Sequence, residues 1–381
     1  MEMWISKEKC MGCNGCGNVC PKSAIEMKTD RTGFSYPIIN QDKCINCGKC
    51  KKACPVFEPP SWNRSVHPEV YAGWSKDSEI RYASTSGGAF SEIAKKVLEK
   101  GGYVAGAAYG KNNMVEHIMI HDMEGLEKIR QSKYIQSDTK DIYRQIKELL
   151  GKNESVAFCG PPCQVAALQK FLEHDYEKLL TIEFICRGMN SPKAYRAWLD
   201  EIEKREAQEV DRVWFKYKEN GWKSSPRCTR VDFKNGSYKV YTGKDNLFME
   251  GYLGPNLYIR PSCGKCEFKG LPRCGDITLA DFWGIEEKYD DDKGTSMILV
   301  NSEKGKEWMN GTLERLQYSR HELSEIYAGN QCFEKPVHIN RRSEEFLISL
   351  DQYPFSRQVK KYSHISFWKR AVRKCKHILK K

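Results

Sequence analysis

One cysteine pattern occurs twice near the start of this chain, and it limits the possible folds more than any other feature. Three cysteines spaced two residues apart are followed, after three more residues, by a Cys-Pro pair, once in residues 10–21 and again in residues 44–55. Thiolates at this spacing can wrap one face of an iron–sulfur cluster from a single tight turn. Zinc is bound by paired Cys-x2-Cys knuckles, and such a site does not require a third cysteine in each run or a Cys-Pro pair. The repeat therefore predicts two 4Fe–4S clusters.

The Cys-Pro cysteine of each run is expected to reach across to the other cluster, as it does in two-cluster ferredoxins. Cluster one then has the ligands Cys10, Cys13, Cys16 and Cys54, and cluster two has the ligands Cys44, Cys47, Cys50 and Cys20. Residues 1–57 resemble bacterial two-cluster ferredoxins in this pattern. We therefore expect an N-terminal domain that transfers electrons.

Composition favours a protein of a reducing compartment. The chain has 381 residues, and its 17 cysteines are an odd number that does not suit a disulfide scaffold. The start resembles no secretory signal, and no run approaches about 18 apolar residues, so we expect a cytoplasmic protein. The net charge of +12 is concentrated in residues 341–381, which hold twelve Lys and Arg against three acids. Because the excess is confined to this segment, we expect no nucleic-acid binding.

Four segments are expected along the chain. They are the two-cluster domain at 1–57, a polar, Pro-containing linker at 58–69, a larger body at 70–340 and a basic tail at 341–381. In the body, strand-like runs such as 179–185 alternate with helical patterns such as 192–205 and 303–317. The fold class expected is α+β: a ferredoxin-like domain followed by a larger α/β body with a mixed sheet.

The end of the chain, residues 362–381, combines an apolar stripe with basic residues at helical spacing. The stripe consists of Trp368, Ala371, Val372, Cys375, Ile378 and Leu379. Such a helix can lie on an anionic membrane surface. It can equally dock on a partner, or remain a solvated terminal helix with a packing stripe. Peripheral contact with the inner membrane surface therefore stays open.

A second set of cysteines lies in the body. Cys163 and Cys186 each follow a predicted buried strand, and Cys263 and Cys266 form a Cys-x2-Cys knuckle. Ends of strands in an α/β sheet meet at one edge, so thiolates from three loops can close a third 4Fe–4S cluster. The alternative is a set of buried structural cysteines. Cys159 and Cys274 are possible substitutes as ligands, whereas Cys228, Cys332 and Cys375 are interpreted as inert.

The body also resembles a known family over residues 70–340. The segments that carry this resemblance are SKYIQSD, CGPPCQVAAL, ICRGMNSP, RPSCGKCEFKG and DITLADFWGI. They are similar to the beta subunit family of coenzyme F-420 hydrogenase/dehydrogenase, which includes deazaflavin-reducing subunits and 7-hydroxymethyl chlorophyll a reductase. The resemblance implies FAD beside a 4Fe–4S cluster, and it strengthens the assignment of the third cluster to Cys163, Cys186, Cys263 and Cys266.

Two departures from the family pattern occur near these cysteines. The family's Gly-Thr-Pro-Cys-Gln motif has Pro161 at its Thr position here, and the motif ends at Gln164. The family's Cys-His-Gly motif has Arg187 in place of histidine. The second departure puts in doubt a proton-transfer role for that position, but it leaves the cysteine unchanged.

The resemblance implies a flavin site in two further segments. A run of hydroxyls and glycines precedes a predicted helix, and N–H groups at a helix start suit a phosphate oxygen. The run consists of Ser84, Thr85, Ser86, Gly87 and Gly88, and from spacing alone it also fits an ordinary helix cap. Lys133 is a candidate contact for flavin or an anion, or otherwise a solvated surface lysine.

These features together predict an iron–sulfur flavoprotein oxidoreductase, because a flavin converts two-electron into one-electron chemistry. Its partners would be a redox protein or soluble electron carrier and an unknown organic substrate or deazaflavin. The alternative is an electron-transfer subunit that has no substrate of its own and feeds a partner enzyme. No catalytic acid or base can be assigned, and His117, His121 and His174 are interpreted as surface or packing residues.

Overall fold

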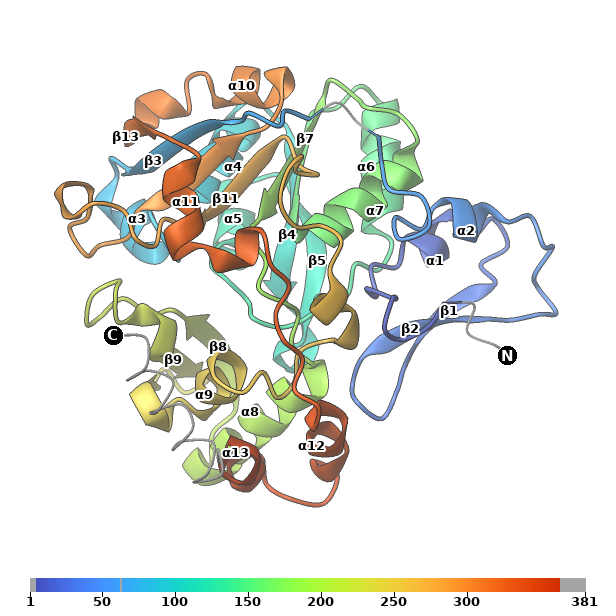
Figure 1. The fold of residues 1–381 in the computed structure, drawn as a ribbon, viewed down its shortest axis with the longest axis vertical. Helices are drawn as coiled ribbons and strands as arrows, with labels where there is room; N and C mark the ends of the chain where they lie inside the picture. The colour runs from blue at the N-terminus through green and yellow to red at the C-terminus, as the bar shows by residue number, and fades with distance from the viewer. Residues whose placement is uncertain (1–4, 62–63, 364–381) are drawn as a thin grey trace, which may run out of the picture.

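The structure, a computed structural model, describes residues 5–61 and 64–363. It has a small N-terminal domain, a body built on one large sheet, and a second lobe below that sheet (Figure 1). The sequence-based fold class is confirmed, because a domain with the repeated cysteines precedes an α/β body whose sheet is mixed.

The large sheet has eight strands in the order β13-β3-β12-β11-β7-β6-β4-β5. Neighbours among β11, β7, β6 and β4 run parallel, whereas the pairs at both ends of the sheet are antiparallel. The strands are β3 (Glu69–Ser75), β4 (Tyr103–Tyr109), β5 (Val115–Ile120), β6 (Val156–Gly160), β7 (Leu179–Phe184), β11 (Ile277–Asp281), β12 (Ser296–Val300) and β13 (Leu316–His321). The carboxyl ends of the four parallel strands therefore meet at one edge of the sheet.

Helices cover both faces of this sheet. One face packs against α4 (Ala89–Glu99), α5 (Met123–Ile129) and α10 (Glu303–Met309). The other packs against α6 (Ile142–Gly151) and α7 (Pro162–Leu172), with α11 (Ser324–Gly329) farther along the same face. The short α3 (Ser78–Ala83) lies between β3 and α4. Because both faces are covered, the central strands are buried on both sides, as continuous apolar runs such as β12 require.

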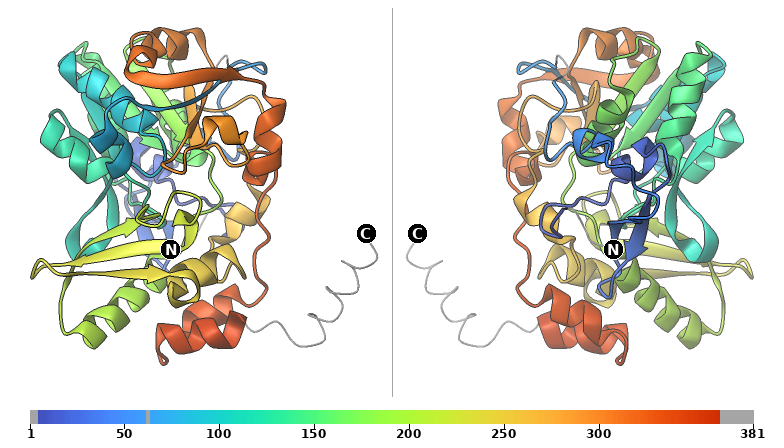
Figure 2. Two further views of the ribbon diagram at one scale, coloured as in Figure 1. Left: turned by 90° about the vertical axis from the view of Figure 1, so that its left-hand side faces the viewer. Right: turned by 90° about the vertical axis from the view of Figure 1, so that its right-hand side faces the viewer.

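The second lobe combines a three-stranded antiparallel sheet with the helices that pack around it (Figures 1 and 2). Its elements are β8 (Val210–Phe215), β9 (Cys228–Phe233), β10 (Tyr238–Thr242), α8 (Pro192–Glu206), α9 (Leu247–Leu253), α12 (Ser343–Ser349) and α13 (Phe355–Ser363). Phe346 and Phe355 of the last two helices are almost fully buried in the core of this lobe. Each such ring stabilises its docking by about 1.5–3 kcal/mol.

The first part of the basic tail expected at residues 341–381 is thus helical and packs against the second lobe. Residues 341–363 belong to the second lobe and are not a free tail. The apolar stripe from Trp368 to Leu379, with its proposed membrane contact, lies outside the described residues. Within those residues, no helix is both long and apolar enough to cross a bilayer.

The N-terminal domain consists of a two-stranded sheet and two short helices, which carry Cys16 and Cys50, while its other six cysteines lie in loops. Its elements are α1 (Gly15–Val19), β1 (Ile25–Thr29), β2 (Ser35–Ile39) and α2 (Lys49–Lys52). The domain lies beside α7 on one flank of the body (Figure 1). Its Phe34 and Tyr36 are buried in the same apolar core as the second lobe, so the domain packs onto the rest of the chain.

The predicted helix at 303–317 is wrong in its second half. Helix α10 ends at Met309, and a strand, β13, begins at Leu316. Gly311 lies between them with a φ of 77°, a left-handed conformation that favours glycine. The Asn310-Gly311 pair is a strong turn signal that could have placed this boundary.

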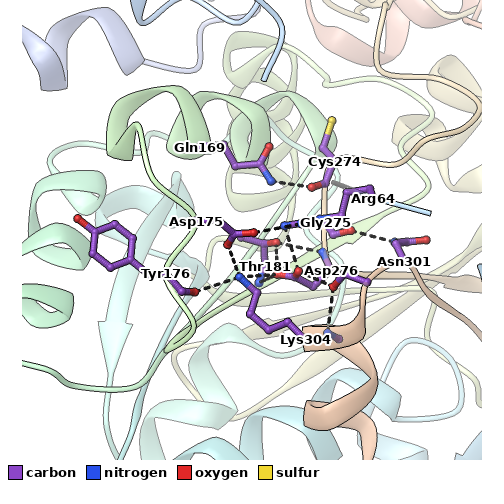
Figure 3. Close-up of polar contacts among 12 residues, drawn as sticks. Arg64, Gln169, Asp175, Tyr176, Thr181, Cys274, Gly275, Asp276, Asn301 and Lys304 are labelled. Atoms are coloured by element: carbon purple, nitrogen blue, oxygen red, sulfur yellow. Dashed lines mark hydrogen bonds and ion pairs between the residues drawn. The ribbon is translucent and has the colours of Figure 1, made fainter. Parts of the chain in front are cut away.

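Arg64, in the second half of the linker, is held by a partly buried ionic network (Figure 3). Arg64 pairs with Asp175 at 3.3 Å and with the fully buried Asp276 at 3.0 Å. Asp276 also accepts hydrogen bonds from Thr181 Oγ1 at 2.6 Å and from the Thr181 backbone N–H at 2.9 Å. The network ties residue 64 to β7 and to the residue before β11, so the start of the body is held against its central strands.

Candidate functional site

The thiols expected to hold cluster one gather on the inner side of the N-terminal domain. Cys10, Cys16 and Cys54 are each at most 8% exposed, although Cys54 comes from the other half of the repeat. Cys13 and Cys16 both interact electrostatically with Cys10 and Cys54. Burial raises the pKa of the Cys13 thiol to about 12. A thiolate at this position therefore needs a bound cation, and iron in a cluster would supply one.

The thiols expected to hold cluster two lie on the outer side of the same domain. Cys47 is exposed, and Cys20, Cys44 and Cys50 are half-buried. Cys50 interacts electrostatically with Cys20 and Cys44, so the Cys-Pro cysteine of the first run lies with the second run. The crossed arrangement of the two runs is thus present in the fold, and it matches the ligand pattern of two-cluster ferredoxins.

A buried arginine joins the inner side of the N-terminal domain to the body. Arg260 is fully buried and donates from Nε to the Cys10 carbonyl at 2.8 Å and from Nη2 to the Ser35 carbonyl at 2.9 Å. Its Nη1 donates to Oε1 of Gln136 at 2.7 Å. The guanidinium lies 4.5 Å from the centre of the Tyr36 ring, and Nη2 lies 3.7 Å from the Cys10 sulfur. One cation thus fixes the domain junction and faces the cluster-one thiols.

The four body cysteines assigned to a third cluster line a single cavity of about 340 Å³, which we call the thiol cavity. Cys163 occupies the first turn of α7, Cys186 follows β7, and Cys263 lies in the short helical turn at Pro261–Lys265 with Cys266 just after it. Cys163 interacts electrostatically with the other three cysteines and with Cys13. The thiol cavity therefore lies next to the cluster-one end of the N-terminal domain.

The surroundings of the thiol cavity suit a negatively charged cluster. The Met189 backbone N–H donates to Cys263 Sγ at 3.4 Å, and the Gly188 N–H faces the sulfur of Cys186. Such bonds raise the potential of an iron–sulfur cluster. The start of α7 adds the positive end of a helix dipole beside Cys163. Among the residues that the structure describes, no three ligating side chains meet closely enough for a single metal ion, and four irons space their thiolates more widely than one ion does.

Cys159 and Cys274, the possible substitutes as ligands, do not line the thiol cavity. Cys159 lines the larger cavity described next, where burial raises the pKa of its thiol to about 12. Cys274 packs with the core beneath α7 and interacts electrostatically with Cys266. The geometry therefore favours the original four cysteines.

A larger cavity of about 520 Å³, which we call the main cavity, opens at the carboxyl edge of the parallel strands. It is lined by the last residues of β6, β7 and β11, among them Gly160, Phe184 and Asp281. Cavities of this size at this edge of an α/β sheet are the usual place for small molecules and cofactors. Cys186 lines both the main cavity and the thiol cavity, so the two share a wall.

The 84–88 loop forms one wall of the main cavity, just before α4. Ser84 Oγ donates to the Ile80 carbonyl at 2.7 Å and Ser86 Oγ donates to the Thr295 carbonyl at 2.8 Å, so both hydroxyls shape the loop. Thr85 Oγ1 accepts from the Ser132 N–H at 2.8 Å. The Thr85 hydroxyl keeps its own hydrogen as a donor, and it can face a ligand together with the N–H groups of the first turn of α4, which suit a phosphate.

Gly87 is the tightest position of this loop. A Cβ at Gly87 would lie 2.3 Å from the Gly73 carbonyl oxygen and 2.8 Å from the Ser296 backbone nitrogen. Gly87 does not itself line the main cavity, whereas Gly88, with a φ of 93°, does. The two glycines thus let the loop pass close to β3 and then turn into α4.

Lys133 reaches the main cavity from the segment after α5. Its Nζ donates to the Arg130 carbonyl at 2.9 Å and lies 5.5 Å from the centre of the Tyr109 ring. Burial lowers the pKa of Lys133 to about 7, with the nearby cation Arg212 adding to the effect. Within the described part of the chain no carboxylate pairs with this ammonium, so an anion in the cavity would stabilise its charged form.

Gln164 does not face the main cavity. Its side chain is buried, and its Nε2 donates to Ser137 Oγ at 3.1 Å. Ser137 in turn lines the cavity. Gln164 therefore acts on the site through the segment that carries Ser137, and we interpret it as a positioning residue.

Sequence reasoning missed several residues that line the main cavity. His117, interpreted from sequence as a packing residue, lines it with its Nε2 3.2 Å from the Cys159 carbonyl oxygen, and burial lowers its pKa to about 4. Lys216 and Asp281 form a buried ion pair at the cavity, and Trp283 stacks on Trp222 with ring centres 4.2 Å apart. These residues come from separate segments, and no local spacing signals their meeting.

Arg187, which stands at the family's histidine position, lies in the wall that the two cavities share. Its Nη2 donates to Asn256 Oδ1 at 2.7 Å, and its guanidinium lies 5.3 Å from the centre of the Tyr252 ring. A guanidinium stays protonated, so Arg187 offers positive charge here and not the proton transfer of an imidazole.

Comparisons with known proteins identify the family of the chain. Family models match residues 70–143 as "Coenzyme F420 hydrogenase/dehydrogenase, beta subunit N-term", residues 153–325 as the C terminus of the same subunit, and residues 9–57 as "4Fe-4S dicluster domain". No curated protein matched. Thirteen chains of solved structures matched, including one from the F420-reducing NiFe hydrogenase complex of Methanosarcina barkeri. That chain is 17% identical with a TM-score of 0.47, over 75% of this chain and 90% of its own.

The two beta-subunit models together span most of the body and lie in the expected order. The dicluster model covers both cysteine runs. The chain is thus an iron–sulfur protein of an oxidoreductase family, and it belongs to the family of coenzyme F420 hydrogenase/dehydrogenase beta subunits, with a 4Fe–4S dicluster domain at its N-terminus.

Proposed function

We propose that this protein is an iron–sulfur flavoprotein oxidoreductase in which three 4Fe–4S clusters connect an external electron carrier to FAD in the main cavity. The observation that carries the proposal is the shared wall at Cys186, which places a four-thiol cavity directly beside a cofactor-sized cavity. Bound there, FAD would exchange two electrons with an organic substrate or deazaflavin and one electron at a time with the clusters.

Different residues of the chain would bind FAD and hold the clusters of such a site. The first turn of α4 and Lys133 offer N–H groups and positive charge for the phosphates of FAD. Cys163, Cys186, Cys263 and Cys266 would hold the third cluster between the flavin and Cys13 of cluster one. Burial of the cluster-one thiols excludes water from the middle of this path, while the exposed Cys47 end leaves an entry for electrons.

The alternative, an electron-transfer subunit without its own substrate, uses the same clusters but needs a partner enzyme for turnover. The main cavity, of about 520 Å³, could hold FAD in either case, so the response to substrate separates the two. Bleaching of bound flavin by a small molecule alone would support the enzyme, whereas turnover only with an added protein would support the alternative.

The cofactor content of the protein tests the proposal. After anaerobic purification we expect about twelve irons, about twelve acid-labile sulfides and about one FAD per chain. Iron and sulfide are measured colorimetrically, and the flavin is measured after release by acid. About eight irons without flavin would contradict the proposal and would leave only electron transfer by the two clusters of the N-terminal domain.

A further inference from the structure

The outer end of the N-terminal domain combines exposed apolar side chains with an exposed cluster ligand. Cys47 and Ile45, which follows Cys44, are exposed, Ile45 by 57%; Phe57, whose ring centre lies 5.8 Å from Lys51 Nζ, is 42% exposed. Because the cluster-one thiols are buried, the cluster-two end is where an electron from outside has the shortest path into the chain.

Lysines surround this end. Five lysines lie within two positions of a cluster-two cysteine and all five are exposed, whereas Asp42 is the one acid within the same distance. They are Lys22, Lys43, Lys49, Lys51 and Lys52. Lys52 has a weak contact with Glu173 at 3.8 Å, and within the described residues no ion pair joins the other four to an acid. Their positive charge is therefore available to a partner.

We propose that this lysine-ringed end is the docking surface for a small acidic one-electron carrier protein, such as an acidic ferredoxin or flavodoxin. The inference rests on the proposed function and adds the chemistry of the partner. A central apolar patch with a charged rim is the usual anatomy of a transient interface. Opposite charge steers such partners and raises the association rate tenfold to a thousandfold at low salt.

The transfer at this surface is simple in its chemistry. The reduced carrier loses one electron and cluster two gains it, and no bond or proton changes place.

An anionic membrane or a nucleic acid could also contact the lysines. The protein carrier is favoured because exposed apolar side chains, Ile45 beside Cys44 and Phe57 against Lys51, suit a protein interface. A nucleic acid or a lipid headgroup also has no electron to deliver to the cluster.

Charge reversal tests the surface. The variant Lys43→Glu/Lys49→Glu/Lys51→Glu is compared with Lys100→Glu/Lys111→Glu/Lys244→Glu, a matched change at exposed lysines of the body and second lobe. The anaerobic protein is mixed with reduced, acidic 2Fe–2S ferredoxin, and the rate of cluster reduction is followed at several salt concentrations. Dithionite reduction and iron content are measured for every variant, because the changed lysines lie next to cluster ligands.

We expect the first variant to lower the second-order rate at low salt at least about tenfold and to lose its salt dependence, while the control resembles the parent. Dithionite should reduce all three proteins alike. A rate that is insensitive to both salt and charge reversal would overturn the docking surface, as would loss of binding to anionic vesicles or RNA without a change in this rate. Clusters that dithionite fails to reduce would instead contradict the proposed function.

Discussion

Replacing Cys163 by alanine is expected to lower the iron content from about twelve to about eight atoms per chain while FAD remains bound. Cys163 is central among the four thiols, since it interacts electrostatically with the other three and with Cys13 of cluster one. It lines the thiol cavity and is absent from the lining of the main cavity, so the substitution removes the third cluster without touching the flavin wall.

Loss of this cluster also breaks the proposed electron path between the N-terminal clusters and the flavin. We expect dithionite-reduced ferredoxin to bleach clusters one and two of the variant at the normal rate, with bound FAD staying oxidised on the same time scale. The control is Cys228→Ala, which changes a buried cysteine in the second lobe outside both cavities. A Cys163→Ala protein that keeps about twelve irons would show that another thiol, such as Cys274, is the ligand.

The second prediction concerns the domain junction. Changing Arg260 to methionine should destabilise the docking of the N-terminal domain by roughly 3 kcal/mol, because it leaves buried carbonyls of Cys10 and Ser35 without their donor. Removing a buried cation near the Cys10 sulfur should also lower the reduction potential of cluster one, since the reduced cluster carries more negative charge.

Limited proteolysis within linker residues 58–69 measures the docking, and a redox titration followed by electron paramagnetic resonance measures the potential. Arg342→Met is the matched control, because Arg342 is half-exposed and pairs with Glu345 at the surface. Its effect on stability should stay within about 0.5 kcal/mol. An Arg260→Met protein with unchanged cleavage and unchanged potential would show that the junction does not depend on this contact.

The sequence was most informative where chemistry dictates short spacing. The two cysteine runs predicted the N-terminal domain, because a cubane needs several thiolates from one turn. The gathering of Cys163 and Cys186 could be expected as well, since the carboxyl ends of neighbouring parallel strands meet at one edge. The structure brings these cysteines into one cavity with the Cys263 knuckle, and their role as cluster ligands stays a prediction.

Other parts of the site could not be predicted from local patterns. The pair of Lys216 and Asp281 joins the residue after β8 to the end of β11, and only the tertiary fold creates it. Gln164 was expected at the flavin but is buried against Ser137, because its helical position turns it away from the cavity. Helices α12 and α13 were not predicted, because residues 341–381 are basic overall and were interpreted as a tail. Phe346 and Phe355 are the buried residues that pack these helices onto the second lobe.

A stoichiometric reductive titration tests the central claim most directly, namely that one chain holds three clusters and a flavin that accept electrons together. Anaerobic protein with bound FAD is titrated with dithionite while the flavin and cluster absorption bands are followed. The account predicts that both absorption bands bleach during the same titration. The chain should take up about five electrons, one for each cluster and two for the flavin. Uptake of about two electrons per chain by clusters alone, in protein that retains no FAD after gel filtration, would contradict it.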